Sequence, residues 1–590
     1  MRGGSYLETS DRSVLVAVAR GDAIADVAIK GVVLFNVLSA TVERVDIGVV
    51  GGRIAYVVPD GTGGAGRKTI EGRNRFAVPG LIDGHVHNES SMVTPAQWSK
   101  SLLVHGTTAV FTDPHEIANV LGLPGIGYML AASADLPLRY YVTAPSCVPA
   151  VLGVETAGAC ITPADMQVLL TWDRVVAVAE AMDFPGLIQQ TGQITSVAQV
   201  AHRCGFGVEG HAPGIVGRRL QAYLVAIGPS GSDHEASLVD EMCEKVRAGM
   251  MVYANSSNFV DDSPAIAAAL RQVGDQRLFG FCTDDIMPDD LIGCGHLDYG
   301  LRRLIAAGVS PMTAFQMATI NVAAHYRMPG LGAIAPGWLA DIVLLEDVNE
   351  VHVDTVIANG EIVVTNGQIA IDIAEPVAPL TVNSVRIPDL SEGDFLRLGG
   401  QTGETAYVGM DYSSRYSRRV TIKAVNRDGR LVLPLPPGVA IAAMVPRHGQ
   451  NSRPSLALLT GFGLQEGAIA STVSHDSHNL VIVGREPRDM LIAAQALVNE
   501  GGGFVAVKNG RVLASVPLPI AGLMSAAPVE VVALQIKELL AVLPELGLPR
   551  SLPGKLMTLG LSVIPHVRLT DLGLVDVDSQ QFIATCALDS

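Results

Sequence analysis

The stretch PGLIDGHVH, residues 79–87, sets two histidines two positions apart at the end of an apolar run. Residues i and i+2 of a β-strand point to the same face, so the imidazoles of His85 and His87 are expected to converge on one point. Asp83 precedes this pair and Glu89 follows it. Imidazoles and carboxylates are ligands of divalent metal ions, and the pattern therefore predicts part of a metal site.

A metal site needs further ligands, and other β-rich runs of this chain end in suitable side chains. Burying an ionisable group is costly unless it is paired or bound to a metal, so a purely structural strand has no reason to end in one. The candidates at these run ends are Asp113, His115, Glu180, His211, His234 and Asp284. We expect a binuclear site in which Glu180 bridges two ions. The first ion would be held by His85, His87 and Asp284, and the second by His211 and His234.

This set of ligands also restricts the chemistry of the site. Two divalent ions about 3.5–4 Å apart can share a hydroxide, which makes water a nucleophile at neutral pH. Nitrogen and oxygen ligands without thiolate suit Mn, Fe or Zn. We therefore expect two divalent metal ions per chain. The ligands alone do not rank the three metals, and our prediction is Mn or Fe, with Zn as the alternative.

The elements that would position these side chains lie between residues 77 and 328, where β-rich runs alternate with helical stretches. The predicted strands are residues 77–87, 108–113, 140–145, 175–180, 207–211, 231–234, 251–255 and 279–284. Eight such runs predict a (β/α)8 TIM barrel, whose active site lies at the carboxyl ends of its strands. The candidate ligands are at those ends.

Two further regions flank the predicted barrel. Glycine-punctuated β-rich runs over residues 25–70 predict a small antiparallel sheet, and a similar pattern returns over residues 332–364. We expect one composite β-sandwich domain built from residues 1–76 plus 329–384, with the barrel over 77–328 inserted in it. Residues 385–590 predict a C-terminal α+β domain. The predicted fold class is therefore α/β, with two flanking domains.

Composition excludes several classes of partner. The net charge of −17, without a basic run to offset it, argues against a nucleic-acid surface. No apolar run approaches the roughly 18 residues of a membrane helix, and residues 1–11 do not resemble a signal peptide. The 7 cysteines are scattered without a C-x-x-C pair, which is typical of a reducing compartment. We expect a cytoplasmic protein, and a homodimer, that binds a small molecule.

Longer motifs around these residues resemble a known family. The motifs are PGLIDGHVHNESSM (79–92), HGTTAVFTDPHEIANVLG (105–122), AEAMDFPG (179–186), EGHAPGIVG (209–217), SDHE (232–235), TDD (283–285), STVSHDSHNLVIVG (471–484) and PLPIAGLMS (517–525). The first resembles the metal-dependent amidohydrolase superfamily, and the set as a whole resembles its adenine deaminases. Glu180 stands where hydantoinase-like members carry a carboxylated lysine. The P-C-x-x-C of the unrelated zinc deaminases is absent.

The resemblance implies a substrate and roles for the site residues. It implies hydrolysis of adenine to hypoxanthine and ammonia, with a metal-bridged hydroxide attacking C6. Asp284 is the candidate base, and His234 could stabilise developing charge as well as bind metal. An acid must protonate N1, and the sequence leaves this role open among Glu89, Asp113, His115 and Glu116.

Other interpretations remain beside this one. Another amidohydrolase, acting on a different aminopurine or a cyclic amide, would use the same site, and a non-catalytic barrel is the rival from another class. Asp113 and Pro114 could also begin a helix as N-cap and first residue. His475, Asp476 and His478 could be a hydrogen-bonded loop, a lid or an extra metal site. His105 and His296 are expected to be structural.

Overall fold

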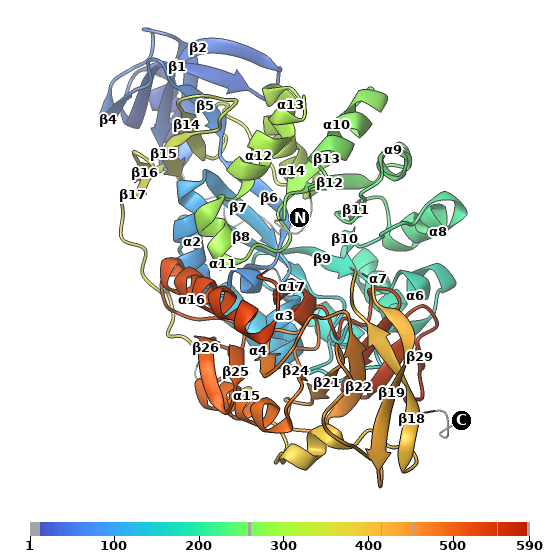
Figure 1. The fold of residues 1–590 in the computed structure, drawn as a ribbon. Coiled ribbons are helices and arrows are strands. Elements are labelled where there is room, and N and C mark those ends of the chain that lie inside the picture. Colours follow the sequence, from blue (N-terminus) through green and yellow to red (C-terminus); the bar gives the residue numbers. More distant parts are fainter. Residues whose placement is uncertain are drawn as a thin grey trace.

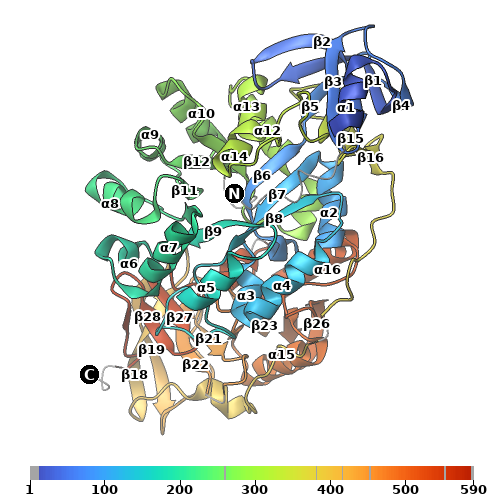
Figure 2. The same ribbon diagram turned by 180° about the vertical axis from the view of Figure 1, so that it is seen from behind.

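The structure is a computed structural model that describes residues 12–257, 261–380, 382–414, 416–450, 453–550 and 553–586. Three parts follow one another in space (Figure 1). At one end lies a β-sheet whose strands come from the segments before and after the barrel in the chain. The barrel is in the middle, and the C-terminal domain lies at the other end. The view from behind gives the same order (Figure 2).

The described part of the barrel contains eight parallel strands. They are β6 (Leu81–Val86), β7 (Thr107–Thr112), β8 (Arg139–Ala144), β9 (Val175–Ala181), β10 (Val208–Gly210), β11 (Ser232–Asp233), β12 (Met251–Asn255) and β13 (Phe279–Cys282). Strands β6 to β10 pair in parallel, as do β11 to β13. A parallel bridge between Val86 and Asp284 joins the two ends. Gly210 N donates to Ser232 Oγ (3.4 Å) where β10 lies beside β11. The (β/α)8 barrel predicted from sequence is therefore present.

Helices cover the outside of these strands. They are α2 (Pro95–Val104), α3 (His115–Leu121), α4 (Leu123–Ala132), α5 (Pro163–Leu169), α6 (Phe184–Gln189), α7 (Gly192–Cys204), α8 (Gly217–Ile227), α9 (Val239–Arg247), α10 (Ser263–Gln272), α11 (Pro288–Gly293), α12 (Leu297–Ala306), α13 (Pro311–Met317) and α14 (Ile320–His325).

Helix α7 illustrates why these segments are helical. Its buried residues include Ile194, Val197, Ala198 and Ala201, a spacing that gives one apolar face on a period of 3.6 residues. The helix ends at Gly205, whose φ of 81° is the left-handed conformation that favours glycine at a helix end. The apolar face packs into the main core of the molecule.

One predicted strand is in fact two. The run 77–87 divides into β5 (Phe76–Pro79), which pairs with strands of the N-terminal sheet, and β6 of the barrel. Gly80 separates them, and a Cβ on it would lie 2.0 Å from Thr108 Oγ1. The chain thus passes between two sheets through a contact too close for any side chain, and the apolar pattern alone did not reveal that break.

The N-terminal sheet has nine described strands. They are β5 together with β1 (Ala25–Asn36), β2 (Thr41–Val50), β3 (Arg53–Pro59), β4 (Gly66–Glu71), β14 (Ile342–Leu345), β15 (Val353–Ala358), β16 (Glu361–Thr365) and β17 (Gln368–Ile369). They form one sheet rather than the two sheets of the expected sandwich. It is also not wholly antiparallel, because β4 and β5 both pair in parallel with β1. A bulge in β1 between Ile29 and Val32 lets the two halves of this long strand take different partners. Helix α1 (Arg12–Arg20) precedes this sheet.

The C-terminal domain is a nine-stranded sheet with helices and a small second sheet. Its main strands are β18 (Gly403–Asp411), β19 (Arg418–Arg427), β20 (Arg430–Leu431), β21 (Ala440–Val445), β22 (Ser455–Thr460), β23 (Ala468–Ser471), β24 (Leu480–Gly484), β25 (Gly503–Lys508) and β26 (Arg511–Pro517). The second sheet comprises β27 (Val567–Thr570), β28 (Gly573–Asp576) and β29 (Gln581–Phe582), and the helices are α15 (Pro487–Glu500), α16 (Val529–Val542) and α17 (Pro553–Met557).

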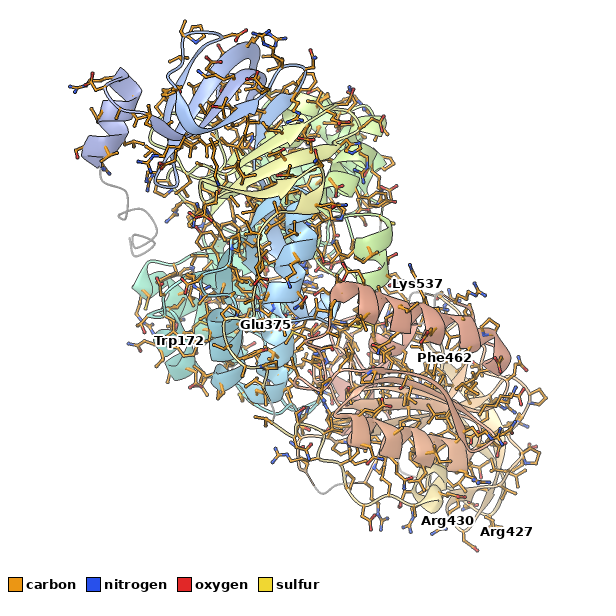
Figure 3. All side chains as sticks on the ribbon, turned by 90° about the vertical axis from the view of Figure 1, so that its left-hand side faces the viewer. Trp172, Glu375, Arg427, Arg430, Phe462 and Lys537 are labelled. Atoms are coloured by element: carbon orange, nitrogen blue, oxygen red, sulfur yellow. The ribbon has the colours of Figure 1, made fainter. Side chains whose placement is uncertain are left out.

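The chain reaches this domain along the outside of the barrel. Glu375 on this connection accepts hydrogen bonds from Thr94 Oγ1 (2.6 Å) and Gln97 Nε2 (3.1 Å) beside α2. Figure 3 places Glu375 against the barrel and Lys537 on α16 at the near edge of the C-terminal domain. Within the described residues, no helix combines the length and apolar character needed to span a membrane.

Candidate active site

The closure of the barrel brings three predicted ligands together. Asp284 N donates to His85 O (3.0 Å), and His87 N donates to Asp284 O (3.0 Å), so β6 fixes the backbone that follows β13. Asp284 Oδ1 then lies 3.6 Å from His85 Nε2 and 3.4 Å from His87 Nε2. Asp284 has a φ of 58°, a conformation uncommon outside glycine. The two backbone hydrogen bonds hold it in that conformation.

Glu180 occupies the centre of the site, at the end of β9. Its Oε1 lies 3.8 Å from His85 Nε2 and 3.5 Å from His87 Nε2. Its Oε2 lies 2.9 Å from His211 Nδ1 and 3.4 Å from His234 Nε2. Each oxygen of one carboxylate therefore faces a different pair of imidazoles.

The electrostatics of Glu180 follow from that position. Burial raises the pKa of its carboxyl group, but hydrogen bonds from His211 and His234 outweigh burial and hold the pKa well below its usual range. The six predicted metal residues, called the barrel cluster below, are all on barrel strands or directly after them: His85, His87, Glu180, His211, His234 and Asp284.

The barrel cluster suits a divalent cation. His85 Nε2 is buried and has no hydrogen-bond partner among the described residues, although it faces two carboxylates. Close histidine and carboxylate ligand atoms occur in the sets His85–His87–Asp284 and His85–Glu180–His234. Nitrogen and oxygen donors of this kind bind divalent transition metals. Glu235, which we did not predict, forms a further set with His211 and His234.

The predicted catalytic residues Asp113 and His115 lie beside this cluster. His115 Nδ1 is 2.9 Å from Asp113 Oδ2 and 3.5 Å from Glu180 Oε1. The expected helix start is wrong in detail, because α3 begins at His115 with Pro114 at its cap, and no side chain caps it. The Asp113 carboxylate binds the imidazole of His115 instead of the free N–H groups of the helix.

Glu89 and Glu116 complete the predicted set. Glu89 Oε1 accepts a hydrogen bond from Ile117 N (3.1 Å), and burial, reinforced by the charge of Glu116, raises its pKa to about 7. Glu116 contacts His475 and His478 of the C-terminal domain. Asp476 Oδ1 lies 3.7 Å from His115 Nε2. We call this second group the shared cluster, since two domains contribute to it: His115, Glu116, His475, Asp476 and His478.

Other buried groups support the ligands. Asp83 Oδ1 accepts from His85 N (3.2 Å) and from Thr283 N (3.1 Å), and thus ties β6 to β13. His296 Nδ1 is 2.9 Å from Thr107 Oγ1, and His105 Nδ1 is 3.1 Å from Asp298 Oδ2. These two histidines lie in the structure around the site and not in either cluster.

Two residues that support the site were not predicted from the sequence. Asn255 Nδ2 donates to Asp284 Oδ2 (3.0 Å), and its place at the end of a predicted strand was the available signal. Lys245 is fully buried and donates to Asp233 Oδ2 (2.8 Å), Glu241 Oε1 (2.6 Å) and Ala212 O (2.6 Å). It links the segments after β10 and β11 that carry His211 and His234. A lysine on a helix face gave no sign of this role.

A parallel barrel with histidines and carboxylates at its strand ends is the arrangement of the metal-dependent amidohydrolases. The sequence model described as Amidohydrolase family matches residues 76–363. A second model, described as Adenine deaminase C-terminal domain, matches residues 415–581. Together with the relatives below, these matches show that the chain belongs to the adenine deaminase family.

The relatives match over nearly the whole chain. An adenine deaminase of Kosmotoga olearia is 37% identical and covers 97% of this chain and 98% of its own length. An adenine deaminase of Nitratidesulfovibrio vulgaris strain Hildenborough is 38% identical, covering 96% and 98%. One from Methanothrix thermoacetophila is 37% identical, covering 95% and 97%. The family and metal-dependent hydrolase assignments made from sequence are confirmed.

Proposed function

We propose that this protein is an adenine deaminase that hydrolyses adenine to hypoxanthine and ammonia. The observation that carries the proposal is the position of Glu180, whose two oxygens face two separate pairs of histidines while Asp284 closes the group. This geometry supports two cation positions, in a chain that aligns end to end with adenine deaminases.

We assign the metal residues as the sequence predicted them. His85, His87 and Asp284 would hold one ion, His211 and His234 the other, and Glu180 both. The nitrogen and oxygen donors fit Mn²⁺, Fe²⁺ and Zn²⁺ alike, and we propose Mn²⁺ or Fe²⁺ with Zn²⁺ as the alternative. When bound, such ions lower the pKa of water and so supply the nucleophile at neutral pH.

Asp284 is the proposed base. Its Oδ1 faces the centre of the barrel cluster, and Asn255 holds its Oδ2. The carboxylate accepts the proton of the attacking water and delivers it to the leaving amine at C6. His234 contacts Glu180 and also faces the site, where a cationic or hydrogen-bonding imidazole stabilises developing charge.

The proton for N1 comes from the acidic side of the pocket. Glu89 Oε2 and Asp113 Oδ1 are each buried without a hydrogen-bond partner among the described residues, whereas Glu116 Oε1 contacts His475 Nδ1. His115 contacts Asp113 (2.9 Å), Glu116 (3.4 Å) and Glu180 (3.5 Å). One of these four groups protonates N1 as the tetrahedral centre forms at C6, and the others orient the purine.

The test is ammonia release from adenine by protein loaded in turn with Mn²⁺, Fe²⁺ or Zn²⁺, with metal content measured on the same samples. Release with about two ions per chain supports the proposal. Two ions without release would keep the metal site and remove adenine as the substrate, and cyclic amides and other aminopurines would be assayed next. Protein that binds no metal would contradict the chemistry.

A further inference from the structure

The C-terminal domain presses one turn, residues 474–479, against the start of α3. Three contacts fix this turn from separate directions. His475 N donates to Met557 O (3.0 Å), Asn479 Nδ2 donates to Thr156 O (2.7 Å), and the ring of His448 contacts Ser477 O (2.7 Å). The turn is therefore held by its own domain and by the barrel, and its side chains have little freedom to move.

The hydrogen bonds of His478 define which of its nitrogens carries the proton. Ser474 N donates to His478 Nδ1 (3.2 Å), so Nδ1 is the acceptor and Nε2 carries the hydrogen of a neutral ring. Nε2 in turn donates to Glu116 Oε2. His478 is 0% and Glu116 2% exposed, so water does not compete for either group.

The other oxygen of Glu116, Oε1, faces His115 on the side of the barrel cluster. Glu116 Oε1 lies 3.4 Å from His115 Nε2, and the opposite nitrogen of that ring lies 3.5 Å from Glu180 Oε1. His475 Nδ1 contacts the same Oε1. Glu116 is thus one imidazole away from the barrel cluster, and its remote oxygen is fixed by a residue more than 360 positions later in the chain.

We propose that His478 is a positioning residue of the active site, which acts by holding the carboxylate of Glu116 toward the purine. The role rests on the proposed function, because it requires Glu116 to face adenine. A carboxylate has two equivalent oxygens and can rotate about its last bond. The Nε2 hydrogen bond fixes Oε2 and thereby leaves Oε1 directed at His115 and His475.

The experiment compares His478→Leu, His478→Gln, Glu116→Gln and the double variant His478→Leu/Glu116→Gln in metal-loaded protein. Glutamine places an amide N–H at the same bond distance from Cβ as histidine Nε2, so it can restore the donor. The control is Tyr407→Phe, which removes two hydrogen bonds of a buried side chain of the same domain: the one donated to Gly399 O (2.9 Å) and the one accepted from Asn426 Nδ2 (2.6 Å).

We expect His478→Leu to lower kcat/KM for adenine roughly 100-fold, mainly through kcat, as loss of a supporting hydrogen bond does in metal enzymes. His478→Gln should recover activity to within about 10-fold of the original protein, with metal content unchanged. In the Glu116→Gln background, His478→Leu should cost less than about 3-fold, because the two residues act as one unit.

Four results would overturn the role. Additive losses in the double variant would mean that His478 does not act through Glu116. A loss of the same size in Tyr407→Phe, or no recovery in His478→Gln, would assign the effect to general damage of the domain. If the unaltered protein does not deaminate adenine, the proposed function fails and this role fails with it, whereas the other three results overturn the role alone.

Discussion

The barrel cluster and the shared cluster use the same residue types in opposite ways. The barrel cluster sets four imidazoles around Glu180 and Asp284, yet His85 Nε2 keeps no hydrogen-bond partner among the described residues. In the shared cluster, both oxygens of Glu116 contact histidines. Burial opposes a charged ring, but Glu116 raises the pKa of His475 to about 9, so the carboxylate has a cation of the protein's own beside it.

The contrast shows that neighbouring buried carboxylates can have different roles. A cluster with unused donor atoms can bind external cations, whereas a cluster that neutralises itself can hold one geometry without them. The two clusters are also held in place by different kinds of interaction. Backbone hydrogen bonds between the end of β6 and Asp284 fix the barrel cluster, and side-chain contacts between two domains fix the shared cluster.

The largest effect on metal binding and activity is expected from substitution of Glu180, the central residue of the barrel cluster. Glu180→Gln keeps the shape but removes the charge that faces both pairs of histidines. Metal content should fall from about two ions to less than one per chain, and deamination should become undetectable. Metal analysis and ammonia release check this. The matched control is Glu209→Gln on β10, a buried glutamate that pairs with His325 (2.8 Å) instead of the cluster, and it should retain its metals.

Asp284→Asn tests whether one barrel ligand also does chemistry. The amide can still occupy the position but cannot accept the proton of water. We expect turnover to fall by about 10³–10⁴-fold, a typical cost of losing a general base, with metal content largely kept. Steady-state kinetics at saturating adenine, together with metal analysis, make the check, and unchanged turnover would remove Asp284 as the base.

Glu155 is a buried glutamate with no described histidine among the main groups that shift its pKa, so it can be compared with Glu180 and Glu116. Burial, reinforced by the charge of Asp476, raises the pKa of Glu155 from its ordinary 4.5 to about 8. Between these pH values the folded protein holds a proton that the unfolded chain has lost, so the contribution of Glu155 makes stability fall as pH rises. Glu155→Gln should therefore be more stable than the original protein at pH 8, by roughly 4 kcal/mol.

The pH dependence supplies its own control. Near pH 4.5 the glutamate is neutral in the folded state, and the difference in unfolding free energy between the two proteins should largely vanish. Denaturant unfolding at several pH values measures it. A difference that is independent of pH would mean that the substitution acts through packing and not through the proton.

The smallest effect should come from support of Asp284. Asn255→Leu removes the donor to Asp284 Oδ2 while keeping the number and branching of the side-chain heavy atoms. We expect a loss of about 10–100-fold in kcat/KM with metals retained, the usual size for a residue that orients a metal-site carboxylate. A loss as large as that of Asp284→Asn would instead make Asn255 part of the reaction, which the geometry does not suggest.

The two clusters also differ in how far sequence could predict them. The period of two on a strand and the rule that parallel strands end at one edge bring His85, His87, Glu180 and Asp284 together without any coordinates. No periodicity links Glu116 to His478, which are 362 positions apart in different domains. Their motifs identified both segments as unusual, but only tertiary packing decides that they touch.

The errors in the fold prediction have the same origin. Residues 77–87 form one apolar run, yet Gly80 passes between two sheets where Thr108 leaves no room for a side chain. Local pattern described each half correctly and could not reveal the neighbour that separates them. Similarly, Pro114 and Asp113 carry the usual signals of a helix start, but Asp113 binds the nearby His115.

The contact between Glu116 and His478 can form only late in synthesis of the chain, because the two residues are far apart in the sequence. At about 5–20 residues per second, the ribosome needs roughly 20–70 s to make the residues between them. Within that interval, the emerging barrel gains the last of its predicted metal ligands when Asp284 is made, and it still lacks the turn that completes the shared cluster. The predicted cation ligands are therefore encoded earlier in the message than the residue that fixes Glu116, so a chain that stops between Asp284 and His478 would carry the first set without the second.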